Sequence, residues 1–219
     1  MSILLCCRCM AAGSVKPKVN KPVSDHYIKD GAMIETAHLQ LCIIEPRHVE
    51  ALARNKSELA ALLHVAVPAN WPHFPEAFSL PTSDSREAEA TPTDWNGYFF
   101  LHRNDHMLIG NGGFNGEPDA SGTIEIGYEI ASDYWNRGFA TEAAMGMIDF
   151  AFAHREVHVV IAHTLAESNA SNRVLQKLGM LFVAELDDPE DGQIWRWQLR
   201  RATENGAPNY VTNSNYCTT

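Results

Sequence analysis

A loop that opens directly into a helix gives this chain a segment suited to binding an anion. Residues from Glu125 onward form an apolar alternating run, which ends in a loop around Gly138, and a helical pattern starts at Ala140. The first backbone N–H groups of a helix have no partner inside it and carry the positive end of its dipole, so they can bind phosphate oxygens. An ordinary strand-to-helix turn is the alternative, because the spacing matches neither a P-loop nor a dinucleotide fingerprint.

This loop resembles the acetyl-CoA pyrophosphate loop of the GNAT superfamily of N-acetyltransferases, in particular the branch that modifies the N-termini of ribosomal proteins. The general pattern is Arg/Gln-x-x-Gly-x-Gly/Ala followed by a helix. Gly138 and Ala140 match it, whereas Trp135 stands at the Arg/Gln position. The resemblance implies that acetyl-CoA is the cosubstrate and that backbone donors of the loop bind its phosphates. These donors belong to Asn136, Arg137, Gly138, Phe139, Ala140 and Thr141.

A second block, residues 162–180, is similar to the next element of the same branch: a strand end, an asparagine-containing loop and a helix that ends in Lys-x-Gly. Ser168, Asn169 and Ser171 are candidates for the N-cap of this helix. The resemblance implies that Asn169 hydrogen-bonds the pantetheine arm. Because the cofactor is an anion, its site has to be locally positive, and Arg137, Arg173 and Lys177 are the candidate cations.

The resemblance extends over residues 34–201 and implies a single α/β (α+β) domain. Its mixed, twisted sheet is splayed in the middle and flanked by helices, and pantetheine lies in the splay against the backbone of Tyr128 and Ile130. Alternating strand and helix patterns along the chain independently predict a sheet that is covered by helices.

Acetyl transfer needs a neutral amine, donors for the oxyanion and a proton for the leaving thiolate. Glu125 matches the glutamate of the EIGY pattern in this branch and is the candidate base or water-positioning residue. A surface carboxylate on a half-buried strand is the alternative interpretation. Glu129 alternates onto the same face and is a lesser candidate.

The proton donor is harder to assign. The tyrosine that is often found in the second motif helix would fall at Leu175, which cannot donate a proton. Ser171 could protonate the thiolate directly or through water, and a plain helix cap is the other interpretation. His163 could titrate near neutral pH, although a lone histidine at a strand end more often has a structural role.

The amino-acid composition of the chain restricts the kinds of partner that it is expected to bind. A formal net charge of −10, from 17 Lys and Arg against 27 Asp and Glu, disfavours a nucleic-acid-binding surface. No apolar run approaches the ~20 residues of a membrane span, and the N-terminus lacks the features of a secretory signal, which favours a cytoplasmic protein without membrane contact.

Both ends of the chain are predicted to be tails. Residues 1–33 read as a disordered extension and residues 202–219 as a polar tail. Cys6, Cys7 and Cys9 could form a lipidation or metal cluster, but no fourth zinc ligand follows at standard spacing, so we expect no metal. The proline-rich stretch 68–92 is too long for a plain connection and is predicted to be either a functional lid or a disordered segment; aromatic residues such as Trp71 favour an ordered lid that faces the substrate.

The sequence therefore predicts an acetyl-CoA-dependent N-acetyltransferase that works by direct attack of an amine in a ternary complex. By resemblance the acceptor is the α-amine of a protein or peptide. A small-molecule acetyltransferase, acting on a polyamine, an amino acid or an antibiotic, is the first alternative. A non-catalytic acyl-CoA-binding sensor is the second, and a homodimer is left open.

Overall fold

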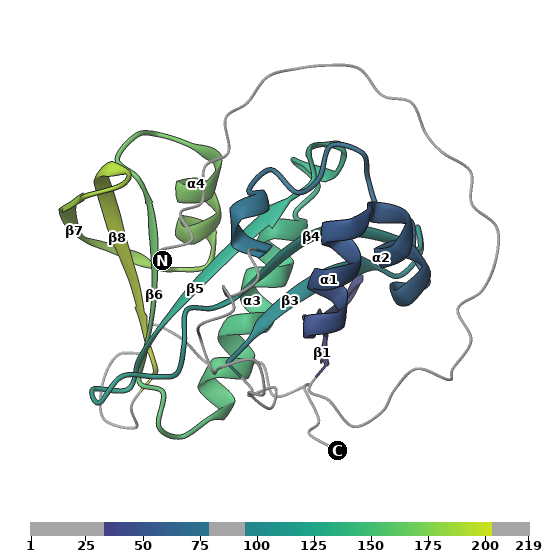
Figure 1. Cartoon of the computed structure of the whole chain (residues 1–219). Coiled ribbons are helices and arrows are strands. Elements are labelled where there is room, and N and C mark those ends of the chain that lie inside the picture. Colours follow the sequence, from purple (N-terminus) through teal and green to yellow (C-terminus); the bar gives the residue numbers. More distant parts are fainter. Residues whose placement is uncertain (1–32, 79–94, 203–219) are drawn as a thin grey trace, which may run out of the picture.

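The computed structural model describes residues 33–78 and 95–202 of the 219-residue chain (Figure 1). The strands and helices in chain order are β1 (Ile34–Glu35), β2 (Leu39–Ile43), α1 (Pro46–Arg54), α2 (Lys56–Leu63), η1 (Pro75–Phe78), β3 (Gly97–His102), β4 (Met107–Phe114), β5 (Thr123–Ile130), η2 (Ser132–Tyr134), α3 (Phe139–Ala153), β6 (Val159–Leu165), α4 (Ala170–Lys177), β7 (Leu181–Asp188) and β8 (Gly192–Arg200).

The described strands form one mixed sheet in the order β1-β2-β3-β4-β5-β6-β8-β7. Neighbouring strands in this sheet are antiparallel except for β5 and β6, which are parallel. The connection between these two strands is α3, as a parallel crossover requires. This arrangement confirms the predicted mixed sheet flanked by helices.

The sheet is splayed between β5 and β6. Their pairing covers only three register pairs, from Thr123↔Val159 to Glu125↔Ile161. Beyond Glu125, β5 continues against β4 as far as Ile130, while β6 continues against β8 as far as Leu165. The two strands therefore diverge in the middle of the sheet, as the resemblance implied.

Helices cover both faces of the sheet. In the larger core cluster, Met147 of α3 packs with inward residues of β3 and β5, such as Phe100 and Ile126. On the opposite face α1 and α2 pack with Phe99 and Leu108 in a second, smaller cluster. The alternation of adjacent residues Phe99 and Phe100 between the two clusters follows from the two-residue period of a strand.

Trp71 corrects the prediction of a substrate-facing lid. Its side chain is fully buried in the smaller cluster, and its indole Nε1 donates to Asn111 Oδ1 at 2.8 Å. Phe78 packs edge-on against it at 5.5 Å between ring centroids. Trp71 therefore serves the core. The rest of the predicted lid, from residue 79, lies outside the described residues, as do Cys6, Cys7 and Cys9.

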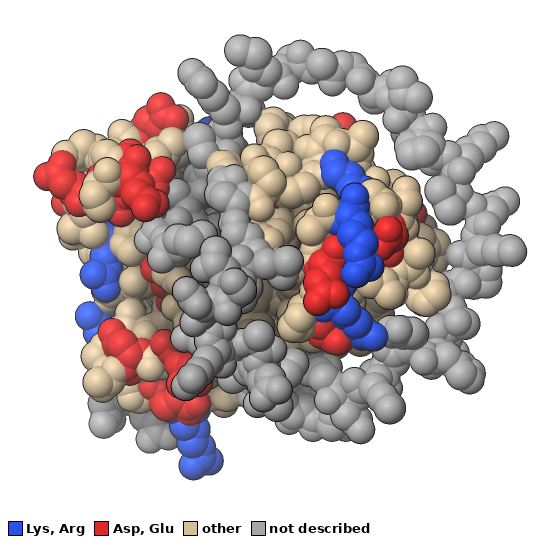
Figure 2. All heavy atoms as spheres, viewed as in Figure 1, with Lys and Arg blue, Asp and Glu red and all other residues tan. Residues whose placement is uncertain are grey.

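The surface near the β7–β8 turn is acidic. Figure 2 shows red side chains gathered at this end of the molecule, where the sequence places Asp187, Asp188, Glu190 and Asp191. β7 is an edge strand, and it also exposes apolar side chains, including Leu181 and Phe182. Within the described residues no helix has the length and apolar character needed to cross a membrane.

Candidate functional site

The loop between β5 and α3 presents its backbone N–H groups outward. Asn136 and Gly138 have positive φ angles of 58° and 89°, and Gly138 is the N-cap of α3 without a side-chain cap. In the part of the chain that the structure describes, the N–H groups of residues 136–141 donate to no other group. A Cβ built on Gly138 would meet no atom within 4 Å, so the loop is open beside these donors.

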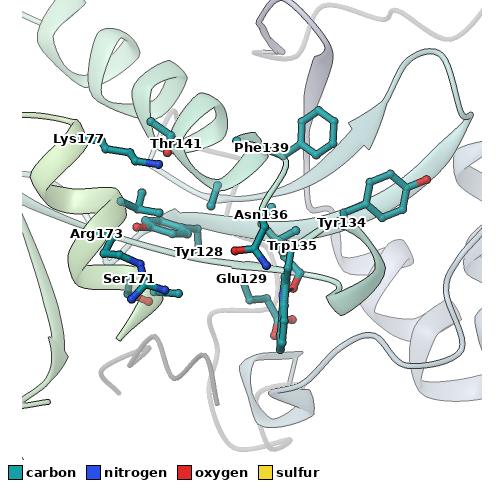
Figure 3. A pocket seen from close by; sticks show the side chains of 15 residues that line it. Tyr128, Glu129, Tyr134, Trp135, Asn136, Phe139, Thr141, Ser171, Arg173 and Lys177 are labelled. Atoms are coloured by element: carbon teal, nitrogen blue, oxygen red, sulfur yellow. Dashed lines mark hydrogen bonds between the residues drawn. The ribbon is translucent and has the colours of Figure 1, made fainter. Parts of the chain in front are cut away.

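A cavity of about 200 Å³ adjoins this loop between β5 and α4 (Figure 3). Figure 3 shows Ser171, Arg173 and Lys177 projecting from α4 on one side, with Glu129 and Asn136 on the other. Most of the predicted site residues line this cavity. They are Tyr128, Ile130, Asn136, Gly138, Phe139, Ala140, Thr141, Ser171 and Arg173.

The backbone of β5 has one edge directed toward the splay. Asn115 N donates to the carbonyl oxygen of Glu125 at 3.0 Å, and Ala131 N donates to the carbonyl oxygen of Ile109 at 2.8 Å. The backbone groups of Glu125 and of Ala131, the residue after β5, are therefore directed toward β4. Because backbone groups alternate in direction along a strand, those of Tyr128 and Ile130 point toward the gap. This is the edge that the sequence analysis expected pantetheine to contact.

Trp135 occupies the Arg/Gln position of the loop pattern and has a structural task there. Its indole Nε1 donates to the carbonyl oxygen of Ile130 at 2.5 Å, and its ring lies 5.7 Å from that of His73. The side chain thus ties the start of the loop to the end of β5. Trp135 also lines the cavity.

The predicted cations divide into two groups. Arg173 and Lys177 line the cavity and make that side of it positive. Arg137 instead packs over the rings of Tyr134 and Phe139, at 4.7 and 5.0 Å from the centroids, and lies 4.0 Å from Asp105. Its side chain is outside the cavity lining, so its predicted contact with the cofactor depends on its backbone N–H.

Tyr134 helps to fix this outer side of the loop. Its hydroxyl donates to Asp105 Oδ2 at 2.8 Å. Burial, this hydrogen bond and the charge of Asp105 raise the pKa of Tyr134 well above its ordinary value. The hydroxyl therefore stays protonated over the working range of pH and anchors the loop as a constant donor.

Ser171 has the environment of a functional hydroxyl. The residue is 2% exposed, lines the cavity, and its Oγ has no hydrogen-bond partner in the described parts of the chain. The N-cap of α4 is Asn169, whose Oδ1 accepts from Asn172 N at 3.0 Å. The capping role that was one interpretation of Ser171 thus belongs to Asn169.

Asn169 does not line the cavity. Besides capping α4, it places its Nδ2 3.5 Å from the carbonyl oxygen of Leu165. The predicted contact between Asn169 and the pantetheine arm remains a prediction.

Glu125 lies at the point where β5 and β6 part. Its Oε1 is 2.7 Å from His163 Nδ1, and its Oε2 accepts from Asn115 Nδ2 at 3.2 Å. Burial acts to raise the pKa of this carboxyl, but His163, Asn115 and Arg196 outweigh it and hold the pKa below its ordinary value. Glu125 is therefore an ionised carboxylate fixed through both oxygens, although it does not line the cavity.

Glu129, the lesser candidate for the base, is the carboxylate that lines the cavity. The residue is 7% exposed, and its Oε2 accepts from His73 N at 3.1 Å. The two-residue period placed it on the face of Glu125, but no local pattern could reveal that His73, more than 50 residues earlier in the chain, covers it.

The described residues contain no group of three or more His, Cys, Asp or Glu side chains that could hold a metal ion. The groups that converge on the cavity are instead backbone donors, two cations, several hydroxyls and a carboxylate. Such a set suits an anionic ligand with a long neutral arm.

Comparisons with known proteins agree with this geometry. Residues 39–181 match the model of the acetyltransferase (GNAT) domain. Among curated proteins, the uncharacterized N-acetyltransferase YjdG of Bacillus subtilis is 23% identical over 150 residues, which cover 68% of this chain and 89% of that protein.

Solved structures share the fold at low identity. RimL, a ribosomal L7/L12 α-N-protein acetyltransferase in complex with coenzyme A, superposes with a TM-score of 0.54 and 15% identity, over 77% of this chain and 98% of its own. A chimeric spermidine N-acetyltransferase SpeG from Vibrio cholerae gives a TM-score of 0.53 and 14% identity, over 75% and 96% of the two chains.

Proposed function

Because the chain belongs to the acetyltransferase (GNAT) domain family, we propose that it transfers the acetyl group of acetyl-CoA to a primary amine by direct attack in a ternary complex. The observation that carries the proposal is the set of N–H groups at residues 136–141, which have no partner within the described residues and lie beside the cavity that Ser171 and Arg173 line. Acetyl-CoA supplies an activated thioester when it is bound.

The residues of this chain fit such a cosubstrate. The loop amides, with Arg173 and Lys177, would hold the phosphates, since aligned backbone donors and cations both stabilise an anion. The backbone edge of Tyr128 and Ile130 would pair with the amide groups of the pantetheine arm. A backbone N–H of the same edge would stabilise the oxyanion.

Two side chains are assigned to proton handling. Glu125 is assigned to the acceptor side, where its carboxylate attracts the ammonium group and helps to remove its proton. Ser171 Oγ, which is buried without a partner among the described residues, would protonate the leaving thiolate. An unpartnered buried hydroxyl costs stability, which is understandable if its partner is a substrate atom.

The preferred acceptor is the α-amine of a peptide or protein. An α-amine has a pKa near ~8 and is partly neutral at physiological pH, whereas a lysine amine near ~10.4 needs a stronger base. The acidic β7–β8 turn adds a negative field that would favour a cationic acceptor. A polyamine is the second candidate, because the spermidine acetyltransferase shares the fold. A thiol-release screen of peptides against polyamines, amino acids and aminoglycosides decides between them.

The loop is tested by two substitutions of the same size at Gly138. Asp and Asn both tolerate positive φ, so the pair differs mainly in charge. Like charges about 4 Å apart near a surface repel by roughly 4 kcal/mol. We expect Gly138→Asp to lower the affinity for coenzyme A by at least about 100-fold, and Gly138→Asn to lower it much less. Calorimetric titration measures both.

Gly192, in the β7–β8 turn, is the matched control. It has a φ of 74° and no atom within 4 Å of a Cβ built on it, so Gly192→Asp carries a similar backbone strain away from the loop. Equal affinities for coenzyme A in Gly138→Asp and the wild type would place the phosphates elsewhere and refute the site.

A further inference from the structure

Glu125 and His163 form a partly buried pair at the point where β5 and β6 diverge. Glu125 belongs to the last register pair between β5 and β6, Glu125↔Ile161, and His163 follows Ile161 by two residues on β6. Their side chains are 16% and 13% exposed, and the atoms Oε1 and Nδ1 are 2.7 Å apart. The pair therefore lies beside the point where the two strands part, and neither side chain belongs to the lining of the cavity.

The geometry fixes the tautomer of His163. An ionised carboxylate can only accept, so Nδ1 carries the proton that it donates to Glu125. In neutral imidazole Nε2 is then the acceptor, and within the described residues it has no hydrogen-bond partner. An oriented carboxylate, an imidazole and an available Nε2 are the parts of a general base.

Proton affinity disfavours the carboxylate of Glu125 as the proton acceptor. The proton of an α-ammonium group with a pKa near ~8 has to move to a group of lower pKa, and the penalty grows with the gap. That gap is about 3.5 pH units for an ordinary glutamate. Glu125 is a still weaker base than ordinary glutamate, because its partners hold its pKa down.

The charges around His163 come from three strands. Glu125 on β5 and Asp188 at the end of β7 are carboxylates that favour an imidazolium, whereas Arg196, its register partner on β8, opposes it. The hydrogen-bonded Glu125 is the nearest of these partners. Its carboxylate can therefore stabilise the protonated ring directly.

We propose that His163 Nε2 takes the proton of the acceptor ammonium group and that Glu125 orients the ring and stabilises the imidazolium. The N–H bond of the amine breaks as the Nε2–H bond forms, and the freed lone pair attacks the thioester carbonyl. As the C–S bond breaks, the attacking nitrogen loses its second proton, which passes through Ser171 or water to the leaving thiolate, so that the Ser171 hydroxyl is restored. The imidazolium returns the first proton to solvent. This inference rests on the proposed acetyl transfer.

The first test is His163→Asn, whose Nδ2 can replace Nδ1 as the donor to Glu125 but which has no counterpart of Nε2. We expect kcat with a peptide amine to fall by about 100-fold or more, with the affinity for coenzyme A unchanged. We also expect free imidazole to restore part of the activity of His163→Gly. Wild-type kcat in His163→Asn would overturn the role of Nε2 and leave acetyl transfer intact.

The second test is the pH profile of kcat/KM in the wild type and in Glu125→Gln. In the wild type we expect a limb that rises with pH as the base and the acceptor ammonium group lose their protons. In Glu125→Gln the limb should persist at a lower kcat/KM, because the ring has lost the carboxylate that orients it. A limb that disappears in Glu125→Gln would make the carboxylate itself the base, which refutes the inference. A wild type that binds coenzyme A and acetylates no amine would instead refute the proposed function.

Discussion

At the scale of single residues, Ser171 and Thr164 both have buried hydroxyl groups, but they differ in whether the hydroxyl has a hydrogen-bond partner among the described residues. Thr164 is fully buried, and its Oγ1 accepts from the indole of Trp197 at 3.0 Å. Ser171 is buried beside the cavity with no partner for its Oγ in the described residues. A satisfied hydroxyl stabilises a fold, whereas an unsatisfied one costs free energy.

We therefore expect Ser171→Ala to separate activity from stability. Its kcat should fall by about 100-fold through loss of the proton donor. Its free energy of unfolding should stay level or rise by about 1 kcal/mol, because a buried unsatisfied group is removed. Thr164→Val is the control and should lose about 1–3 kcal/mol. Urea unfolding and steady-state kinetics measure these values, and a marked destabilisation of Ser171→Ala would show that Oγ has an internal partner.

At the scale of the elements, α3 contains a glycine whose role is packing. Gly146 is buried in the middle of the helix, where glycine costs about 1 kcal/mol relative to alanine. A Cβ there would come within 2.9 Å of Thr36 Cγ2 and 3.3 Å of Ile34 Cγ2. Gly146 lowers the helix propensity of α3 but leaves room for β1 to pack closely against the helix.

Gly146→Ala should consequently destabilise the fold, against the expectation from helix propensity. Thr36 cannot move away freely, since its hydroxyl donates to Glu142 on α3. We expect a loss of about 1–3 kcal/mol from overpacking, measured by chemical unfolding. Ala140→Gly, at a less buried position of the same helix, is a control for propensity alone. A gain in stability in Gly146→Ala would mean that β1 adjusts without cost.

At the scale of the whole molecule, Glu142 joins segments more than 100 residues apart in the chain. Its Oε1 accepts from Thr36 Oγ1 at 2.5 Å and from His38 N at 2.6 Å, and its Oε2 lies 2.9 Å from His38 Nδ1. Burial acts to raise the pKa of this carboxyl, but the bonds from Thr36 and His38 outweigh it, so the pKa lies below its ordinary value.

This depressed pKa makes stability depend on acidity in a defined direction. The unfolded chain takes up a proton on Glu142 more readily than the folded chain, so the stabilisation is present above the unfolded pKa of about 4.5 and is lost as the pH falls through the folded one. We expect Glu142→Gln to lose about 1–3 kcal/mol at neutral pH and to show a shallower acid decline. Glu117→Gln, at an exposed position, should match the wild type in unfolding experiments. Parallel acid curves for Glu142→Gln and the wild type would contradict this.

Much of the fold could be predicted from the sequence because its signals are local. The two-residue period of β5 and the glycine at the start of α3 each fix their own backbone. What could not be predicted depends on distant contacts. Buried Trp71 depends on Asn111 as the acceptor for its indole N–H, and Glu129 is covered by His73, whose backbone N–H donates to its carboxylate. The pairing of Glu125 with His163 joins residues 38 apart, and only the short parallel ladder brings them together.

Trp135 departs from the Arg/Gln position of the loop pattern, yet the backbone of the loop keeps its positive φ angles at Asn136 and Gly138. The indole donates a hydrogen bond to the carbonyl oxygen of Ile130, and it stands at the position that the general loop pattern gives to arginine or glutamine. The N–H groups that we propose bind the phosphates belong to the main chain, so the type of side chain at residue 135 leaves them in place. A genome search keyed to the letters of the motif would pass over such chains, whereas one keyed to the backbone angles at Asn136 and Gly138 would retrieve them.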